Sequence, residues 1–289
     1  MSAVRVDFAI RAISVAAMSI LKPLLLCALV WPTLVTVGKA HEFWIEPENF
    51  QPAPETAISA DLRNGQNFAG SALSWFDPRN VRVEWHRGDE VQPITGRPGD
   101  IPALSVNPGG DGLLVLAYQT TATLLTYKDW DTVLAFAAHK DFPWFAAQHA
   151  ARGLPQEAVK EVYTRYCKSL VGIGDGAGSD VTIGFAVEFL ALSNPYQDDL
   201  SEGFRARLLY QGQPLNDSQV EVFDKAPDGS VIVTRLRTDA AGEVRVPVSP
   251  GHRYLLDHVV LREPDPGTEG ANWAMWESLW ASLTFAVPQ

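Results

Sequence analysis

His41 is the residue of this chain whose position offers the most specific chemistry. It follows Gly38-Lys39-Ala40, and small residues at positions 38 and 40 fit the cleavage site of a secretory signal peptide. Cleavage after Ala40 would make His41 the first residue, so that its α-amine and ring Nδ1 could chelate one metal ion together. Both groups lose their protons near neutral pH, at about 7.7–8.0 and about 6.5, and metals bind the deprotonated forms. The sequence therefore predicts a metal-binding N-terminus that proteolysis creates.

The residues before His41 have the features of a cleaved leader. Residues 1–40 carry four basic residues against one acidic residue, and residues 24–37 are almost wholly apolar. That run is shorter than the ~20 residues that span a bilayer. We therefore expect residues 1–40 to be a signal peptide and the mature protein to be periplasmic. The alternative is an N-terminal membrane helix that stays uncut.

Further metal ligands would have to come from elsewhere in the fold. No two histidines have the close spacing of a structural zinc site, and Cys167 has no partner cysteine. The amine and ring of His41 with one more imidazole would form a T-shaped set of three nitrogens, which favours copper(II) and then nickel(II). The sequence contains six histidines: His41, His86, His139, His149, His252 and His258.

Among these, His258 is the preferred second imidazole, because it lies in a predicted strand that could pair near the N-terminal strand. His139, beside Lys140, is the second choice, and Glu42 or Glu46 is expected to supply an oxygen. Each residue also has a simpler interpretation. His41 would then be a solvated terminal residue, and the two other histidines would be ordinary core or surface residues.

Composition narrows the classes of partner. The formal net charge is −11, and loss of the leader makes the chain more acidic still. Such a chain repels nucleic acid and anionic membranes. Only Cys167 remains after cleavage, so the mature chain cannot form an internal disulfide, and we expect this thiol to be buried.

The elements that would position these residues are predicted to be mainly β. Residues 57–62, 81–86 and 113–118 read as short strands between turn-rich segments. Residues 131–170 have helical spacing, including an apolar stripe over residues 157–170, and predict a helical insertion. We therefore expect an N-terminal β-domain over residues 41–190, with the insertion at about residues 131–170.

Residues 191–289 read as strands again, and Leu279, Ala281, Leu283 and Phe285 alternate as in a last strand. Gly212-Gln-Pro-Leu, Thr238-Asp-Ala-Ala-Gly and Gly251-His-Arg-Tyr254 resemble the pattern of a transthyretin-like or Ig-like β-sandwich. This segment is the predicted C-terminal domain.

Several motifs together resemble one exported family. The motifs are His41-Glu-Phe-Trp44, Leu62-Arg-Asn-Gly65, Glu161-Val-Tyr-Thr-Arg165, Asn194-Pro-Tyr196, Gly212-Gln-Pro-Leu and Trp280-Ala-Ser-Leu-Thr-Phe285. The chain is similar along its mature length to the family called domain of unknown function 4198 (DUF4198), some of whose members are described as substrate-binding regions of nickel uptake. The resemblance implies a periplasmic β protein with a transition-metal role, and it carries over no catalytic residue.

The leading hypothesis is therefore a protein that binds or delivers nickel or copper, passes it to a membrane transporter and performs no catalysis. A carbohydrate- or protein-binding β-module without metal is one alternative. The other is a copper oxidase with a histidine brace, for which Trp44, Trp75 and Trp85 would supply an aromatic face. No Gly-x-Ser-x-Gly motif or other nucleophile arrangement points to hydrolysis.

Overall fold

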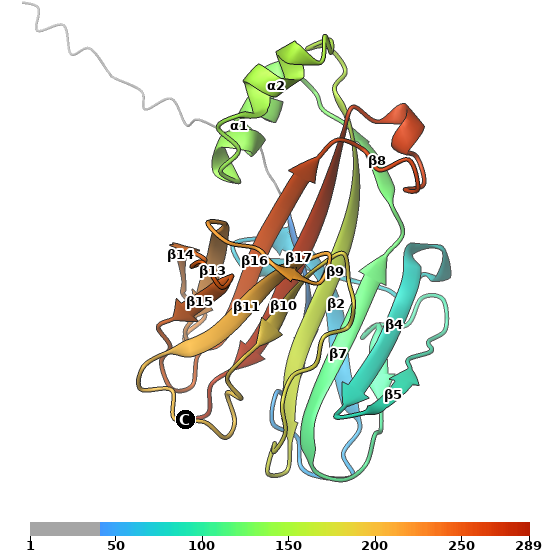
Figure 1. Ribbon diagram of the computed structural model, residues 1–289. Coiled ribbons are helices and arrows are strands. Elements are labelled where there is room, and N and C mark those ends of the chain that lie inside the picture. The colour runs from blue at the N-terminus through green and yellow to red at the C-terminus, as the bar shows by residue number, and fades with distance from the viewer. Residues whose placement is uncertain (1–40) are drawn as a thin grey trace, which may run out of the picture. The chain divides into compact units, whose positions relative to one another are not determined.

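The structure, a computed structural model, describes residues 41–289. The predicted signal peptide, residues 1–40, lies outside the described residues. The fold is mainly β, as expected, and its described part is built from three sheets and two α-helices (Figure 1). In this part of the chain, no helix is both long enough and apolar enough to cross a membrane.

A long central sheet organises the molecule, and one small sheet packs on each of its faces. The central sheet contains, in spatial order, β14 (Val231–Arg237), β13 (Gln219–Lys225), β16 (Arg253–Arg262), β17 (Trp276–Ala286), β9 (Lys160–Ile173), β7 (Gly112–Thr120), β4 (Asn80–Arg87) and β5 (Glu90–Pro93), with β8 (Thr123–Thr126) beside β9. The strands predicted at residues 81–86 and 113–118 are β4 and β7.

The first small sheet contains β1 (Glu42–Pro47), β2 (Ile58–Gln66), β3 (Ala69–Leu73) and β6 (Leu104–Val106), and β2 confirms the strand predicted at residues 57–62. We call the face of the central sheet that it covers the N-face. The second small sheet contains β10 (Val187–Ala191), β11 (Phe204–Tyr210), β12 (Gln213–Pro214) and β15 (Glu243–Val246), and it covers the C-face.

Strand β17 shows how the sequence sets the two faces, because successive side chains of a strand point to opposite sides. Leu279, Ala281, Leu283 and Phe285 pack on the C-face in one apolar cluster with residues of β10 and β11. Trp280 packs on the opposite face against the helices. The alternation that the sequence predicts for the last strand is therefore confirmed.

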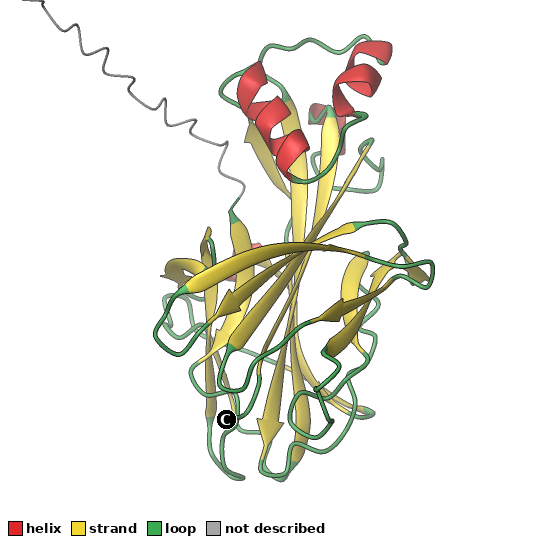
Figure 2. Ribbon diagram, turned by 90° about the vertical axis from the view of Figure 1, so that its left-hand side faces the viewer, coloured by secondary structure: helices red, strands yellow, loops and turns green. Residues whose placement is uncertain are grey.

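The helical segment is shorter than the predicted insertion. Helices α1 (Trp130–His139) and α2 (Phe145–Ala151) lie together at one end of the molecule (Figure 2). Two short 3-10 helices, Asp77–Arg79 and Ala271–Trp273, complete the list of elements. Helix α1 begins where the Asp129 carboxylate accepts a hydrogen bond from the Thr132 backbone N–H, an ordinary N-cap.

The helix predicted over residues 157–170 is wrong, because residues 160–173 form the long strand β9. Val162, Tyr166 and Leu170 are four residues apart, a spacing that fits a helical stripe and one face of a strand equally well. The segment is rich in β-branched and aromatic residues. Nearly every residue of β9 is buried, which is the pattern of a central strand covered on both faces.

The boundary expected near residue 190 does not separate two sheets. Strand β17, from the predicted C-terminal domain, pairs in parallel with β9, from the predicted N-terminal domain. The described residues belong to one compact unit.

Candidate functional site

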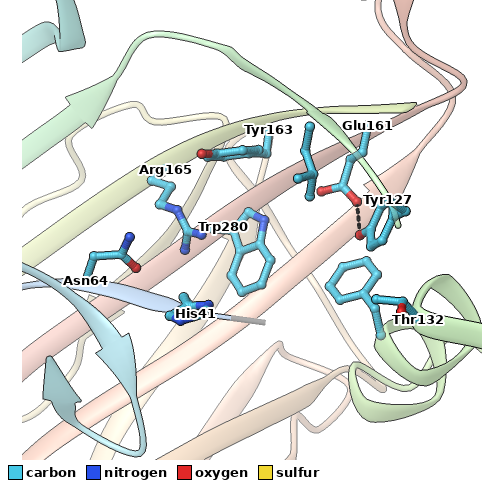
Figure 3. A pocket seen from close by; sticks show the side chains of 10 residues that line it. His41, Asn64, Tyr127, Thr132, Glu161, Tyr163, Arg165 and Trp280 are labelled. Carbon is cyan, nitrogen blue, oxygen red and sulfur yellow. Dashed lines mark hydrogen bonds between the residues drawn. The ribbon is translucent and has the colours of Figure 1, made fainter. Parts of the chain in front are cut away.

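A cavity of about 270 Å³ lies where the start of β1 meets α1, β8, β9 and β17 on the N-face (Figure 3). Its walls include Tyr127, Phe136, Tyr163 and Trp280, and its polar lining includes His41, Asn64, Glu161 and Arg165. We call this cavity the aromatic pocket. It brings together residues that are up to 239 positions apart in the chain, so it exists only in the folded protein.

His41 stands at the mouth of this pocket, directly before a firmly held strand. Its side chain is exposed, whereas all six residues of β1 are buried. Phe43, two residues later, stacks on Tyr118 with ring centroids 5.6 Å apart. The backbone that carries His41 is thus fixed by packing, and only the histidine itself faces solvent.

Asn64 lies on the same face as His41, diagonally across the β1–β2 pair. Phe43 is paired with Asn64 in the β1–β2 register, and directly opposite residues share a face. His41 is two residues from Phe43, so it lies on the same face. The next residue, Gly65, lets β3 approach closely, because an added Cβ would lie 2.1 Å from the Ala69 carbonyl oxygen. This close approach fixes the strand that presents Asn64.

Arg165 supplies the cation of the aromatic pocket. The residue is 9% exposed, and its guanidinium lies 4.4 Å from the Trp280 ring centroid and 5.2 Å from that of Tyr163. Its Nη1 atom has no hydrogen-bond partner within the described residues. Burial lowers the pKa of Arg165 below its ordinary value.

Glu161 lies at the other end of the pocket from Arg165 (Figure 3). The hydroxyls of Tyr127 and Ser278 donate hydrogen bonds to its two carboxyl oxygens. Burial raises the pKa of Glu161, although these hydrogen bonds and the Arg165 charge act in the opposite direction. The pocket therefore has one cationic end and one end formed by a hydrogen-bonded acid.

Glu42, a predicted ligand, points away from His41, since neighbouring side chains on a strand face opposite ways. It is buried, and its Oε2 has no hydrogen-bond partner among residues 41–289. Burial, followed by the nearby charge of Asp257, raises the pKa of Glu42 to about 8. At neutral pH this side chain is a neutral acid, which is a poor metal ligand.

His139 belongs to a buried ionic cluster beside Glu42. Its Nε2 lies 3.1 Å from Glu221 Oε1, and its Nδ1 lies 3.1 Å from a guanidinium nitrogen of Arg235. Lys140 in turn contacts Glu221 at 2.5 Å and Asp257 at 2.7 Å. Both ring nitrogens of His139 are thus engaged, and His139 is not part of the aromatic pocket's lining.

His258 lies on the C-face, opposite the aromatic pocket. It pairs with Ala281, whose side chain packs in the C-face cluster, whereas the neighbouring Trp280 lines the pocket. Its Nδ1 lies 2.7 Å from the Gln219 carbonyl oxygen, so Nδ1 carries the proton and donates. Burial lowers the pKa of His258 to about 4. The structure therefore does not bring His41 and His258 together.

A conventional metal cluster does not occur in the described part of the chain, where no group of three or more His, Cys, Asp or Glu side chains is arranged to hold an ion. Sequence reasoning missed Asn64, Glu161 and Arg165 as site residues. No local signal marks the last two in the sequence, because their segment also contains Lys160 and Lys168.

Comparisons with known proteins identify a matching family and two solved structures of low similarity. A family model described as "Domain of unknown function (DUF4198)" matches residues 38–261. No match was found among curated proteins. The chain is similar to a solved structure titled "D0-D1 domain of Intimin", with 11% identity and a TM-score of 0.21 over 84% of this chain and 97% of that one.

A second similar structure is titled "Crystal structure of tetra-tandem repeat in extending region of large adhesion protein". It shows 10% identity and a TM-score of 0.19 over 85% of this chain and 49% of that one. Both scores are too low for either protein to inform the site.

Proposed function

The chain belongs to the DUF4198 family, and we propose that it is a periplasmic protein that binds nickel(II) or copper(II) at His41 and delivers the ion to a membrane transporter without catalysing a reaction. Cleavage after Ala40 is part of this proposal, because the backbone nitrogen of His41 is an amine rather than a peptide nitrogen only in the processed chain.

One observation carries the proposal: an exposed histidine directly precedes a strand whose residues are all buried. A terminal histidine on a mobile tail would have to be ordered when it binds a metal, and ordering one residue costs roughly 1–2 kcal/mol of backbone entropy. Here β1 already holds the next residue. The amine and Nδ1 would therefore be presented together at the mouth of the pocket.

The remaining ligands follow from the geometry. Asn64 shares the face of His41 and lines the same pocket, so we assign its amide oxygen as a further protein ligand. His258 is excluded from this set by its place on the C-face, and His139 by its contacts to Glu221 and Arg235. The positive charge of Arg165 would repel a metal ion at His41, so binding there would be favoured by a negatively charged ligand that offsets this charge.

Isothermal titration calorimetry tests the proposal with the mature protein beginning at His41, freed of metal on a chelating resin. We expect one copper(II) or nickel(II) ion per chain, with a dissociation constant below about 1 μM. His41→Ala should weaken binding by at least about 100-fold, and Asn64→Ala by about tenfold. His252→Ala, a control at a histidine outside the aromatic pocket's lining, should change nothing. Binding weaker than micromolar for both ions contradicts the proposal.

A further inference from the structure

Arg165 is a buried cation that forms no ion pair with residues 41–289. Its Nη1 finds no hydrogen-bond acceptor among residues 41–289, and its guanidinium is surrounded by aromatic rings. Buried charges in proteins are normally paired or hydrogen-bonded, because taking an ion out of water is costly. The faces of Trp280 and Tyr163 offset part of that cost through cation–π attraction, but they satisfy none of the N–H donors.

The surroundings of Arg165 indicate which kind of ligand could accept hydrogen bonds from its guanidinium. The guanidinium offers donors in a planar fork that matches a carboxylate. Beyond it, Tyr127, Phe136 and Trp280 form apolar walls around about 270 Å³ of space, just below the size of pockets that hold drug-sized ligands. We propose that the aromatic pocket binds a small organic carboxylate, with its carboxylate on Arg165 and its apolar body between the rings.

The far end of the pocket is compatible with such a ligand. Figure 3 places Glu161 and Tyr127 away from Arg165, with Trp280 between the two ends. Glu161 already accepts hydrogen bonds from Tyr127 and Ser278. At that end of the pocket it offers a polar contact to a ligand that carries a hydroxyl or amino group at the end opposite its carboxylate.

This inference stands apart from the proposed function, because it depends on Arg165 and not on the N-terminal amine. The two sites share one cavity, with His41 at its mouth, so a bound carboxylate could also contact a metal there. Neither binding event requires the other.

Calorimetry on the metal-free mature protein tests the inference with sodium benzoate as the probe. We expect a dissociation constant of about 1 mM or below. Benzamide has the same shape without the charge, and it should bind at least about tenfold more weakly, since hydrogen bonds to charged groups contribute about 1.5–3 kcal/mol. Inorganic phosphate tests for a site that takes any anion. No heat with benzoate at 10 mM, or equal binding of benzamide or phosphate, overturns the inference.

Variants assign the site to Arg165. Arg165→Met should weaken benzoate binding at least about tenfold, and Arg165→Lys should do so in part, because it keeps the charge and loses the fork. Arg152→Met is the matched control, since Arg152 also stacks on a tryptophan, 4.6 Å from the Trp276 ring, outside the aromatic pocket. Unchanged benzoate binding by a folded Arg165→Met protein overturns the inference. If that variant does not fold, unchanged binding by Arg165→Lys does so.

The same variants separate the two proposals. His41→Ala should weaken metal binding at least about 100-fold and benzoate binding far less, whereas Arg165→Lys should weaken benzoate binding more than metal binding. Loss of the metal result alone leaves the carboxylate site standing, and loss of the benzoate result alone leaves the metal site standing.

Discussion

Lys140, the residue that follows helix α1, places its Nζ 2.7 Å from the carboxylate of Asp257 on strand β16, with both side chains almost wholly buried. Glu221 on β13 contacts the same Nζ at 2.5 Å. Lys140 also lies 5.0 Å from the ring centroid of Trp280, a wall of the aromatic pocket. This ion triad therefore ties the helical segment to the central sheet beside the candidate site.

Loss of Lys140 should be strongly destabilising. Lys140→Met leaves the buried Asp257 without an ion-pair partner within residues 41–289, whereas Glu221 keeps its contacts to His139 and Arg235. Breaking a buried ion pair in this way costs about 3–5 kcal/mol. We expect that loss in the free energy of unfolding measured with urea. Lys128→Met, at an exposed lysine, is the control and should stay within about 0.5 kcal/mol. A loss below about 1 kcal/mol would mean that the triad does not anchor the helices.

Glu42 should make stability fall as pH rises. Its pKa is raised by burial from 4.5 to about 8, so between these values the folded protein holds a proton that the unfolded chain has released. Stability decreases with pH wherever the folded state binds more protons, by about 1.4 kcal/mol per pH unit for one group.

Urea unfolding of Glu42→Gln between pH 5 and pH 8 measures this contribution. The variant should gain stability over the wild type steadily across that range, and Glu48→Gln, at an exposed site, should run parallel to the wild type. A constant difference between Glu42→Gln and the wild type over this range would show that Glu42 is ionised in the fold.

Cys167 should be inert in the native protein. Its side chain is buried on β9, and burial raises the pKa of the thiol to about 12, so almost no thiolate exists near neutral pH. We expect no reaction with a disulfide reagent at pH 8 over an hour, and one equivalent of reaction per mature chain in 6 M guanidinium. Rapid labelling of the native protein would show that β9 opens readily.

Gly65→Ala should disturb the strand that presents Asn64. The added methyl would meet the backbone oxygen of Ala69 at 2.1 Å, and backbone atoms cannot rotate away. We expect a loss of about 1–3 kcal/mol in unfolding free energy. Gly267→Ala, where the nearest atom belongs to the Asp265 side chain at 3.3 Å, should be nearly neutral. Similar effects of the two substitutions would argue against a tight β2–β3 pairing.

Local patterns predicted much of the fold. The alternation at Leu279, Ala281 and Leu283 identified both the last strand and its inner face, and turn-rich segments correctly separated β2, β4 and β7. The pattern failed at Val162, Tyr166 and Leu170, because a four-residue spacing does not distinguish a helix from a strand that is buried on both faces. Only the partners of β9, which come from β7 and β17, decide between the two.

The candidate site was less predictable from the sequence. His41 could be singled out because a cleavage motif precedes it, but no local signal shows which residue faces it. The prediction of His258 as the second imidazole ligand depends only on its place in a strand. A strand position without its pairing partners does not show which face of the sheet the side chain lies on. Asn64 and Arg165 reach the pocket because β1 pairs with β2 and because that sheet packs on β9. Both are contacts between segments far apart in the chain, so they cannot be recognised from a local sequence pattern.

The most direct test of the proposed function compares two proteins that differ only before His41. One begins at His41, and the other carries a single additional alanine in front of it. Copper(II) and nickel(II) titrations of both should show binding that is at least about 100-fold weaker in the extended protein, because the added peptide bond removes the amine from the chelate. Equal affinities in the two proteins would contradict a metal site built on the N-terminal histidine.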